Sequence, residues 1–214
     1  MTDLIQQLND EMADVVDHVK HTLVHVTNNG QSHGAGIIVS SDGSILTNAH
    51  VVRQRSLQVT LPDGKTVPAK LVAHDAERDL ALLKIDVTEL PAMQIGDTQE
   101  LQAGQWVMAV GHPWGVAGAV TSGVLIDKTN HLINQPSEGR QWLAANLHLR
   151  PGNSGGPLVD VKGRLLGLNT VMAGPEVGLA VPADVIQTFL QEVAQALGNH
   201  KPDYLENNQR PEIV

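Results

Sequence analysis

The sequence has 214 residues, of which 42% are hydrophobic and 17% are charged, and its formal net charge is −9. This is the composition of a globular protein, and the negative charge disfavours non-specific binding to nucleic acid or to an anionic membrane surface. The chain contains no cysteine, which excludes disulfides, thiolate catalysis and cysteine-ligated zinc.

Residues 1–21 are predicted to form an N-terminal helical arm that packs on the body of the protein or on a neighbouring subunit. Its apolar residues recur at helical spacing: Leu4, Ile5, Leu8, Met12, Val15, Val16 and Val19. His18, His21 and His25 invite a metal-binding interpretation. However, His25 lies where the pattern changes to strand, so the three need not converge, and we expect neither a metal nor another cofactor.

From residue 22 onward the pattern is that of short strands. Strands are predicted over residues 22–27, 35–40, 44–47, 57–61, 67–74, 80–85, 106–110, 116–126, 141–147, 158–161, 164–170 and 178–181. About a dozen short strands are typical of a sandwich or of barrels, and one small barrel needs fewer. We therefore expect two similar halves, over about 22–90 and 104–181. The segment between these ranges is expected to connect the two halves.

The segment over residues 182–197 is predicted to form an amphipathic C-terminal helix that begins at about Asp184, with Pro182 before it and Gly198 after it. Residues 198–214 are polar and are predicted to form a flexible tail. The first residues lack the basic start and apolar run of a signal peptide, and no segment has the length of a membrane span. The compartment stays open: it is cytoplasmic if the chain is full length, and periplasmic or extracytoplasmic if a leader was removed.

The most informative stretch is PGNSGGPL, residues 151–158, which reads as a glycine-rich loop ending in a strand. A serine on such a loop can expose its hydroxyl beside unbonded backbone N–H groups. Acyl transfer needs that combination of a nucleophile and of donors for the oxygen that becomes negative. Ser154 is therefore a candidate nucleophile. The alternative is a glycine-rich turn with an incidental serine.

His50 is the best candidate for the base, because it follows an apolar strand and can point into a cleft. Asp79 directly precedes another apolar strand, where pairing with an imidazole N–H would offset the cost of burying its carboxylate. The alternatives are a surface histidine after a hairpin, and an acid that caps a strand or pairs with Arg78 or Lys84. The chain order His50, Asp79, Ser154 is the one found on double β-barrels.

Four stretches carry a resemblance to trypsin-like serine proteases, specifically to the HtrA/Deg branch: SDGSILTNAHVV, RDLALLKID, AVGHPWGVAGAVTSGV and RPGNSGGPLVDVKGRLLGLNT. The resemblance covers about residues 22–197. It implies an all-β protease domain of two six-stranded antiparallel, chymotrypsin-like barrels, with the triad in the cleft between them. It also implies an oxyanion hole formed by Gly152 and Ser154, with Asn153 as a further candidate, and cofactor-free endopeptidase hydrolysis of polypeptides through an acyl-enzyme.

By the same resemblance, the pocket for the residue before the scissile bond lies near Leu149, Leu168, Asn169 and Leu179. No acid occurs in the matching stretch, so we expect cleavage after small aliphatic residues such as Val or Ala and not after Arg or Lys. Adjacent His148 is expected to be structural. The family's role in protein quality control implies unfolded or misfolded polypeptides as substrates.

The chain also departs from the family pattern. The given sequence stops about where the family's PDZ domain would begin, so we expect no gating by such a domain within it, and the family's Thr-Asp-Ala before the loop is replaced by residues 145–147, Ala-Asn-Leu. Asn153 stands where digestive trypsins have an aspartate, so zymogen cleavage is not expected. The family commonly forms trimers through aromatic residues near the N-terminus, and none precedes Trp106 here, which weakens the expectation of a homotrimer.

Three alternatives remain open at this level. The first is a peptide-binding or chaperone-like module whose triad is seldom assembled, and the second is an ester hydrolase with the same acyl chemistry. The third concerns the tail: its end, Pro211–Val214, resembles a cleaved product that can lie in a neighbouring cleft, although a flexible tail is favoured.

Overall fold

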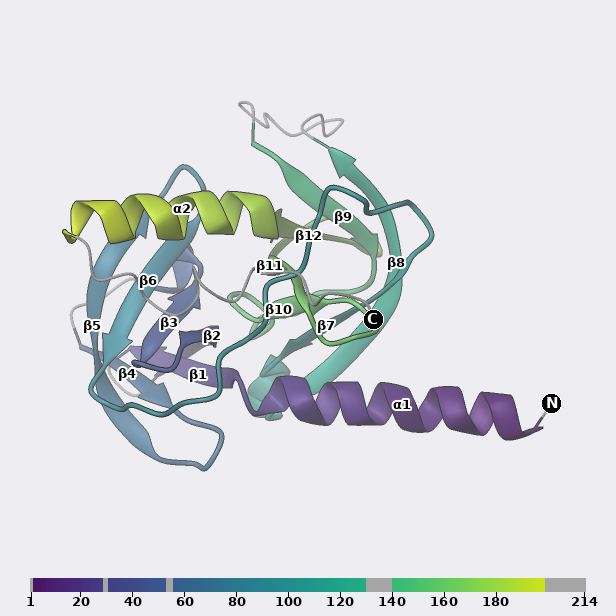
Figure 1. Ribbon diagram of the computed structural model, residues 1–214, viewed down its shortest axis with the longest axis horizontal. Coiled ribbons are helices and arrows are strands. Elements are labelled where there is room, and N and C mark those ends of the chain that lie inside the picture. The colour runs from purple at the N-terminus through teal and green to yellow at the C-terminus, as the bar shows by residue number, and fades with distance from the viewer. Residues whose placement is uncertain (1, 29–30, 53–55, 130–139, 199–214) are drawn as a thin grey trace, which may run out of the picture.

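The computed structural model describes residues 2–28, 31–52, 56–129 and 140–198 (Figure 1). Its strands form two closed six-stranded barrels, ordered β1-β2-β3-β6-β5-β4 and β10-β11-β12-β9-β8-β7. All strand pairs within the barrels are antiparallel. The predicted fold class is therefore confirmed. The predicted tail, with the product-like end Pro211–Val214, lies outside the described residues beyond 198.

Barrel one consists of β1 Leu23–Asn28, β2 Gln31–Ser40, β3 Ser44–Thr47, β4 Leu57–Thr60, β5 Thr66–Asp75 and β6 Leu80–Ile85. Barrel two consists of β7 Trp106–Gly111, β8 Ala119–Thr129, β9 Trp142–Asn146, β10 Pro157–Val159, β11 Leu165–Gly174 and β12 Val177–Pro182. Each of the twelve predicted strands corresponds to one of these. The largest shifts are of four residues, at the start of β2 and at the end of β11. β8 starts three residues after the predicted Val116, because the short 3-10 turn η2 (Pro113–Gly115) and Gly118, with φ of 63°, come first.

The strands β3 and β6 are buried along almost their whole length, Lys84 being half-buried, because both of their faces are covered. Ile45 pairs with Leu83, and both belong to the core inside barrel one. The next pair, Leu46 and Leu82, belongs to a second core that also contains residues of barrel two and of the C-terminal helix. The two strands thus connect the interior of barrel one with the interface between the barrels.

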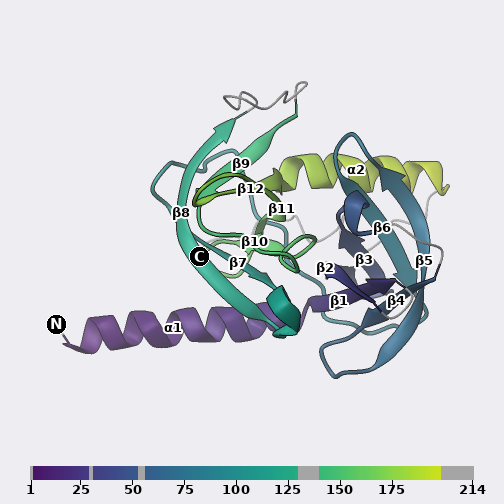
Figure 2. The same ribbon diagram turned by 180° about the vertical axis from the view of Figure 1, so that it is seen from behind.

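The two helices lie at opposite edges of the molecule, as both views show (Figures 1 and 2). The C-terminal helix α2, Ala183–Ala196, buries Ile186, Phe189 and Leu190 in the core shared by the barrels. The N-terminal helix α1, Thr2–Lys20, buries Val19 completely, whereas Leu4 and Ile5 are 71% and 72% exposed. The arm therefore packs on the body through its second half only. No helix in the described part of the chain is long and apolar enough to cross a membrane.

Candidate active site

His50 and Asp79 lie together at one end of barrel one. β3 and β6 are neighbours with Thr47 opposite Ala81, so the residues that follow β3 and precede β6 meet at the same edge. His50 stands in the short 3-10 turn η1, Ala49–Val51, and its Nδ1 lies 2.8 Å from Asp79 Oδ2 and 3.0 Å from Oδ1. The carboxylate also accepts the backbone N–H of His50 at 3.0 Å.

The carboxylate of Asp79 holds both the ring and the backbone of His50, and this fixes the imidazole in one orientation. Asp79 is only 9% exposed, so these bonds replace the water that burial removes. The residue has a φ of 56°, which is unusual for a residue with a side chain. A hydrogen bond at Nδ1 leaves Nε2 as the ring nitrogen that can accept a proton.

The loop before Ser154 is closed by reciprocal bonds between Arg150 and Asn153. The N–H of Arg150 donates to Asn153 Oδ1 at 2.9 Å, and the N–H of Asn153 donates to the Arg150 carbonyl at 2.8 Å. Gly152, with φ of 102°, turns its carbonyl to the N–H of His112 at 2.9 Å, and the Asn153 carbonyl accepts the N–H of Gly156 at 2.9 Å. Both carbonyls are therefore engaged by backbone donors.

These bonds also decide which donors the loop can offer to an oxyanion. Within the part of the chain that the structure describes, the N–H groups of Gly152 and Ser154 have no hydrogen-bond partner. The Asn153 N–H, in contrast, is already used inside the loop. The Asn153 N–H is thus engaged inside the loop in this structure, and its contribution to an oxyanion hole stays a prediction.

Barrel one holds the Ser154 loop through β2. The N–H of Ala35 donates to the Ser154 carbonyl at 2.8 Å, and Thr47 Oγ1 donates to the Ala35 carbonyl at 2.7 Å. Gly155 packs so closely on Ala35 and Thr47 that a Cβ there would collide with both. Because Thr47 is three residues before His50, the same contacts bring the serine loop to the end of barrel one where His50 and Asp79 lie.

The hydroxyl of Ser154 donates to the carbonyl of Thr170, in β11, at 3.0 Å. A hydroxyl has one hydrogen, so this bond and a bond to an imidazole exclude each other. Rotation about the serine side chain is required before His50 can take its proton. The sequence patterns did not identify Thr170, because this contact comes from the β11 carbonyl and carries no side-chain signal.

The four residues predicted to line the specificity pocket are all buried: Leu149, Leu168, Asn169 and Leu179. Leu168 and Leu179 lie in the core shared by the barrels, whereas Leu149 lies in the core of barrel two. Asn169 Nδ2 donates to the Pro157 carbonyl at 2.8 Å, just beyond the serine loop. Their role in substrate selection stays a prediction. Nearby, His148 Nδ1 lies 3.0 Å from the carboxylate of Glu176.

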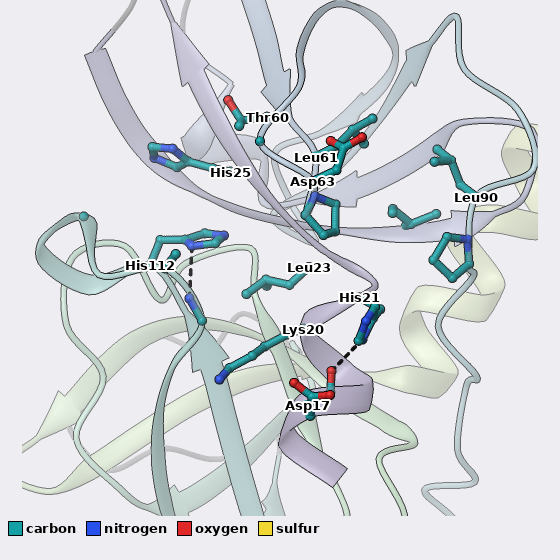
Figure 3. Close-up of a pocket in the computed structure, with 17 residues that line it drawn as sticks. Asp17, Lys20, His21, Leu23, His25, Thr60, Leu61, Asp63, Leu90 and His112 are labelled. Carbon is teal, nitrogen blue, oxygen red and sulfur yellow. Dashed lines mark hydrogen bonds between the residues drawn. The ribbon is translucent and has the colours of Figure 1, made fainter. Parts of the chain in front are cut away.

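A cavity of about 760 Å³ lies elsewhere, between the end of α1, β1, the β4–β5 turn and the loop over residues 112–118 (Figure 3). None of His50, Asp79 and Ser154 lines it. The rings of His25 and His112 meet at its wall with centroids 5.2 Å apart. Burial, and secondarily the neighbouring His25, lowers the pKa of His112 to about 4.

The three histidines of the metal interpretation lie in different parts of the fold, at the end of α1, just after it and in β1. His18 is in α1, whereas His21 and His25 line the cavity, and His21 Nδ1 is 2.8 Å from the Asp17 carbonyl. Among the described residues, no group of three or more histidines or carboxylates is placed to hold a metal ion.

Residues 34–168 match the family model described as a trypsin-like peptidase domain, and this range includes His50, Asp79 and Ser154. The chain is 38% identical over 168 residues to a putative serine protease HhoB of Synechocystis, covering 76% of this chain and 40% of that protein. It is 41% identical over 161 residues to a probable periplasmic serine endoprotease DegP-like of Pseudomonas putida, covering 72% and 33%.

The fold likewise matches a solved structure described as an HtrA-type protease AlgW with decapeptide. The TM-score is 0.79 at 28% identity, and the match covers 86% of this chain and 67% of that chain. The chain spans about 40% of the length of the HhoB relative. The family model, the relatives and the double barrel agree: this chain belongs to the trypsin-like serine proteases, in their HtrA/Deg branch.

Proposed function

We propose that the chain is a serine endopeptidase that uses Ser154 as nucleophile, His50 as general base and acid, and Asp79 as the group that orients the imidazole. The observation that carries this proposal is the contact of 2.8 Å between His50 Nδ1 and Asp79 Oδ2. It leaves Nε2 as the proton acceptor at the end of barrel one where the Ser154 loop is anchored.

Peptide hydrolysis then proceeds in two steps. The Ser154 hydroxyl leaves the Thr170 carbonyl, gives its proton to His50, and attacks the substrate carbonyl. The N–H groups of Gly152 and Ser154 stabilise the oxyanion, by roughly 3–4 kcal/mol per donor. His50 protonates the leaving amine, and a water molecule, activated by the same imidazole, releases the acyl group. Asp79 stabilises the imidazolium in both steps.

For the substrate, we propose unfolded or misfolded polypeptides, cleaved after Val or Ala, in protein quality control. The support is the absence of an acidic residue among Leu149, Leu168, Asn169 and Leu179, which leaves no partner for a basic side chain. A homotrimer is proposed from the resemblance alone.

The proposal is tested with a fluorophosphonate probe and with unfolded β-casein. We expect the folded wild-type protein to be labelled and to digest casein, and both activities to be lost in Ser154→Ala. The exposed residue Ser56 offers a matched control, because Ser56→Ala removes a hydroxyl far from the loop in sequence. Labelling that persists in Ser154→Ala would refute the assignment of the nucleophile.

A second candidate, a peptide-binding module with a resting triad, is favoured by the bond from Ser154 Oγ to the Thr170 carbonyl. This candidate predicts that the protein binds casein without cleaving it. It also predicts that the fluorophosphonate probe does not label the protein even when casein is present. An ester hydrolase, by comparison, predicts turnover of a simple p-nitrophenyl ester without cleavage of casein.

A further inference from the structure

Asn48 is a completely buried polar residue between β3 and the turn that carries His50. An asparagine in front of a helical turn normally caps that turn with its side chain. Asn48 makes no such bond, although it stands at the cap position of η1. Its side chain is therefore used for something other than the local turn.

Both hydrogens of the Asn48 amide are donated across the site. Nδ2 lies 2.9 Å from the carbonyl oxygen of Asp79 and 3.0 Å from Oγ1 of Thr170. The Asp79 carbonyl can only accept, and Thr170 Oγ1 gives its own hydrogen to the Leu168 carbonyl at 3.0 Å. The two partners are thus both acceptors, which fixes the orientation of the amide with Nδ2 facing them.

The two partners belong to different halves of the site. Asp79 is in barrel one and carries the carboxylate that holds His50, with its backbone at φ of 56°. Thr170 is in barrel two, and its carbonyl holds the hydroxyl of Ser154 at 3.0 Å. A single amide therefore joins the residue that orients the imidazole to the residue on which the serine rests.

The other end of the same amide has no partner. Asn48 Oδ1 is buried and makes no hydrogen bond to any described residue. An unsatisfied buried acceptor destabilises a fold, so a residue that serves packing alone would be better apolar. Asn28 provides a comparison, because it is also buried with an unpartnered Oδ1, and its Nδ2 bonds the Val51 carbonyl at 2.9 Å.

We propose that Asn48 is a positioning residue whose amide ties the Asp79 backbone to Thr170 and so keeps the acid–base pair of barrel one aligned with the serine of barrel two. The inference rests on the proposed function, since alignment matters only if these groups react together. It assigns to Asn48 a role that neither its place before a turn nor its burial requires.

The first experiment compares Asn48→Leu with Asn28→Leu in the full chain. Both changes remove a buried amide and its unpartnered oxygen, but only the first removes the bonds to Asp79 and Thr170. We expect kcat/KM for peptide hydrolysis to fall about 100-fold in Asn48→Leu, mainly through kcat, and to stay within about threefold of wild type in Asn28→Leu. Similar thermal stabilities make the comparison valid. Equal activities in the two variants would overturn the proposal.

The second experiment isolates the bond between the barrels. Thr170→Val removes the hydroxyl oxygen that accepts the Asn48 amide, whereas Thr170→Ser keeps it. Activity should therefore fall in the valine variant and stay close to that of the wild type in the serine variant. In Asn48→Leu the acidic limb of the kcat/KM profile should also move to lower pH, because a less well-placed Asp79 stabilises the imidazolium less. Activity lost equally with Val and Ser at position 170, or an unmoved limb, would count against the role.

A measurement that needs no activity separates this proposal from the proposed function. The downfield proton signal of His50 Nδ1–H reports the His50–Asp79 contact in NMR spectra, whether or not the protein hydrolyses peptides. We expect the signal in the wild type and in Asn28→Leu, and its loss or upfield shift in Asn48→Leu. If the wild type shows the signal without hydrolysis, the proposed function fails. If Asn48→Leu keeps the wild-type signal, the positioning role of Asn48 fails.

Discussion

The backbone N–H of Ala35 donates to the carbonyl of Ser154 at 2.8 Å, so a strand of barrel one supports the candidate nucleophile of barrel two. Gly34, which precedes Ala35, also packs against the Ser154 carbonyl, and there is no space there for a side chain. A Cβ added at Gly34 would lie 2.7 Å from the Ser154 carbonyl oxygen and 2.8 Å from Val51 Cγ2, next to His50. This approach depends on the absence of a side chain.

Gly34→Ala should therefore impair catalysis. The Ser154 carbonyl is backbone and cannot yield like a side chain, so the serine loop must move away from β2, and we expect kcat/KM to fall roughly 10- to 100-fold. Gly36→Ala is the control, because a Cβ there meets Ile45 and Val24 inside barrel one, 2.9 and 3.1 Å away. The control should lose about 1–3 kcal/mol of stability with near-normal activity per folded molecule. Wild-type activity in Gly34→Ala would contradict the argument.

Asn153→Ala should loosen the serine loop. The buried Asn153 side chain accepts the Arg150 N–H at 2.9 Å, and alanine leaves that donor without its partner. We expect a loss of about 1–3 kcal/mol, divided between unfolding free energy and slower fluorophosphonate labelling. Asn146→Ala is the matched change at an exposed asparagine. Urea unfolding and labelling rates indistinguishable between the two variants would rule out a structural role for Asn153.

Trp114 has a left-handed backbone conformation, and its side chain makes a cation–π contact with Arg150. Its φ is 55°, and its ring centroid lies 4.8 Å from Cζ of Arg150. Trp114→Ala should lose the cation–π contact, about 0.5–1 kcal/mol, and keep the strain. Trp114→Gly loses the same contact but relieves roughly 1–2 kcal/mol of left-handed strain, so it should be the more stable variant. Urea denaturation measures the order, and a more stable alanine variant would disprove the strain.

The lowered pKa of His112 predicts a loss of stability on mild acidification. Its pKa is about 4 in the folded protein, against an ordinary value of 6.5, because burial disfavours the charged ring. Between these values the unfolded chain binds a proton that the folded protein does not, so the unfolding free energy should decrease as pH falls from 6.5 to 4. The full effect is about 3 kcal/mol, and it should level off below pH 4.

His112→Asn provides the control for this pH dependence. An asparagine can still offer an acceptor to the Gly118 N–H, which lies 3.4 Å from His112 Nδ1, but it does not titrate. The variant should therefore lose much less stability between pH 6.5 and 4, with a smaller slope remaining from His25, whose pKa burial also lowers. Parallel curves for the two proteins in urea titrations would exclude His112 as the source.

The double barrel was predictable because its signals are local. Alternation within each strand and the glycine-rich turns between them depend on residues a few positions apart, and all twelve strands were located from them. The number of strands predicted two halves, and the resemblance added that each half is a six-stranded barrel. The start of β8 was placed three residues too early, because Trp114 adopts a left-handed backbone conformation that its residue type does not predict.

The sequence by itself determined which residues are chemically able to act: a serine on a glycine loop, a histidine after one strand and an aspartate before another. Only the tertiary structure decided how they are held, with Asn153 closing the loop from within, Ser154 resting on the Thr170 carbonyl, and Asn48 joining partners 31 and 122 positions away. Such contacts involve backbone groups and distant side chains, and their geometry is set by how the two barrels pack and not by any local pattern of residues.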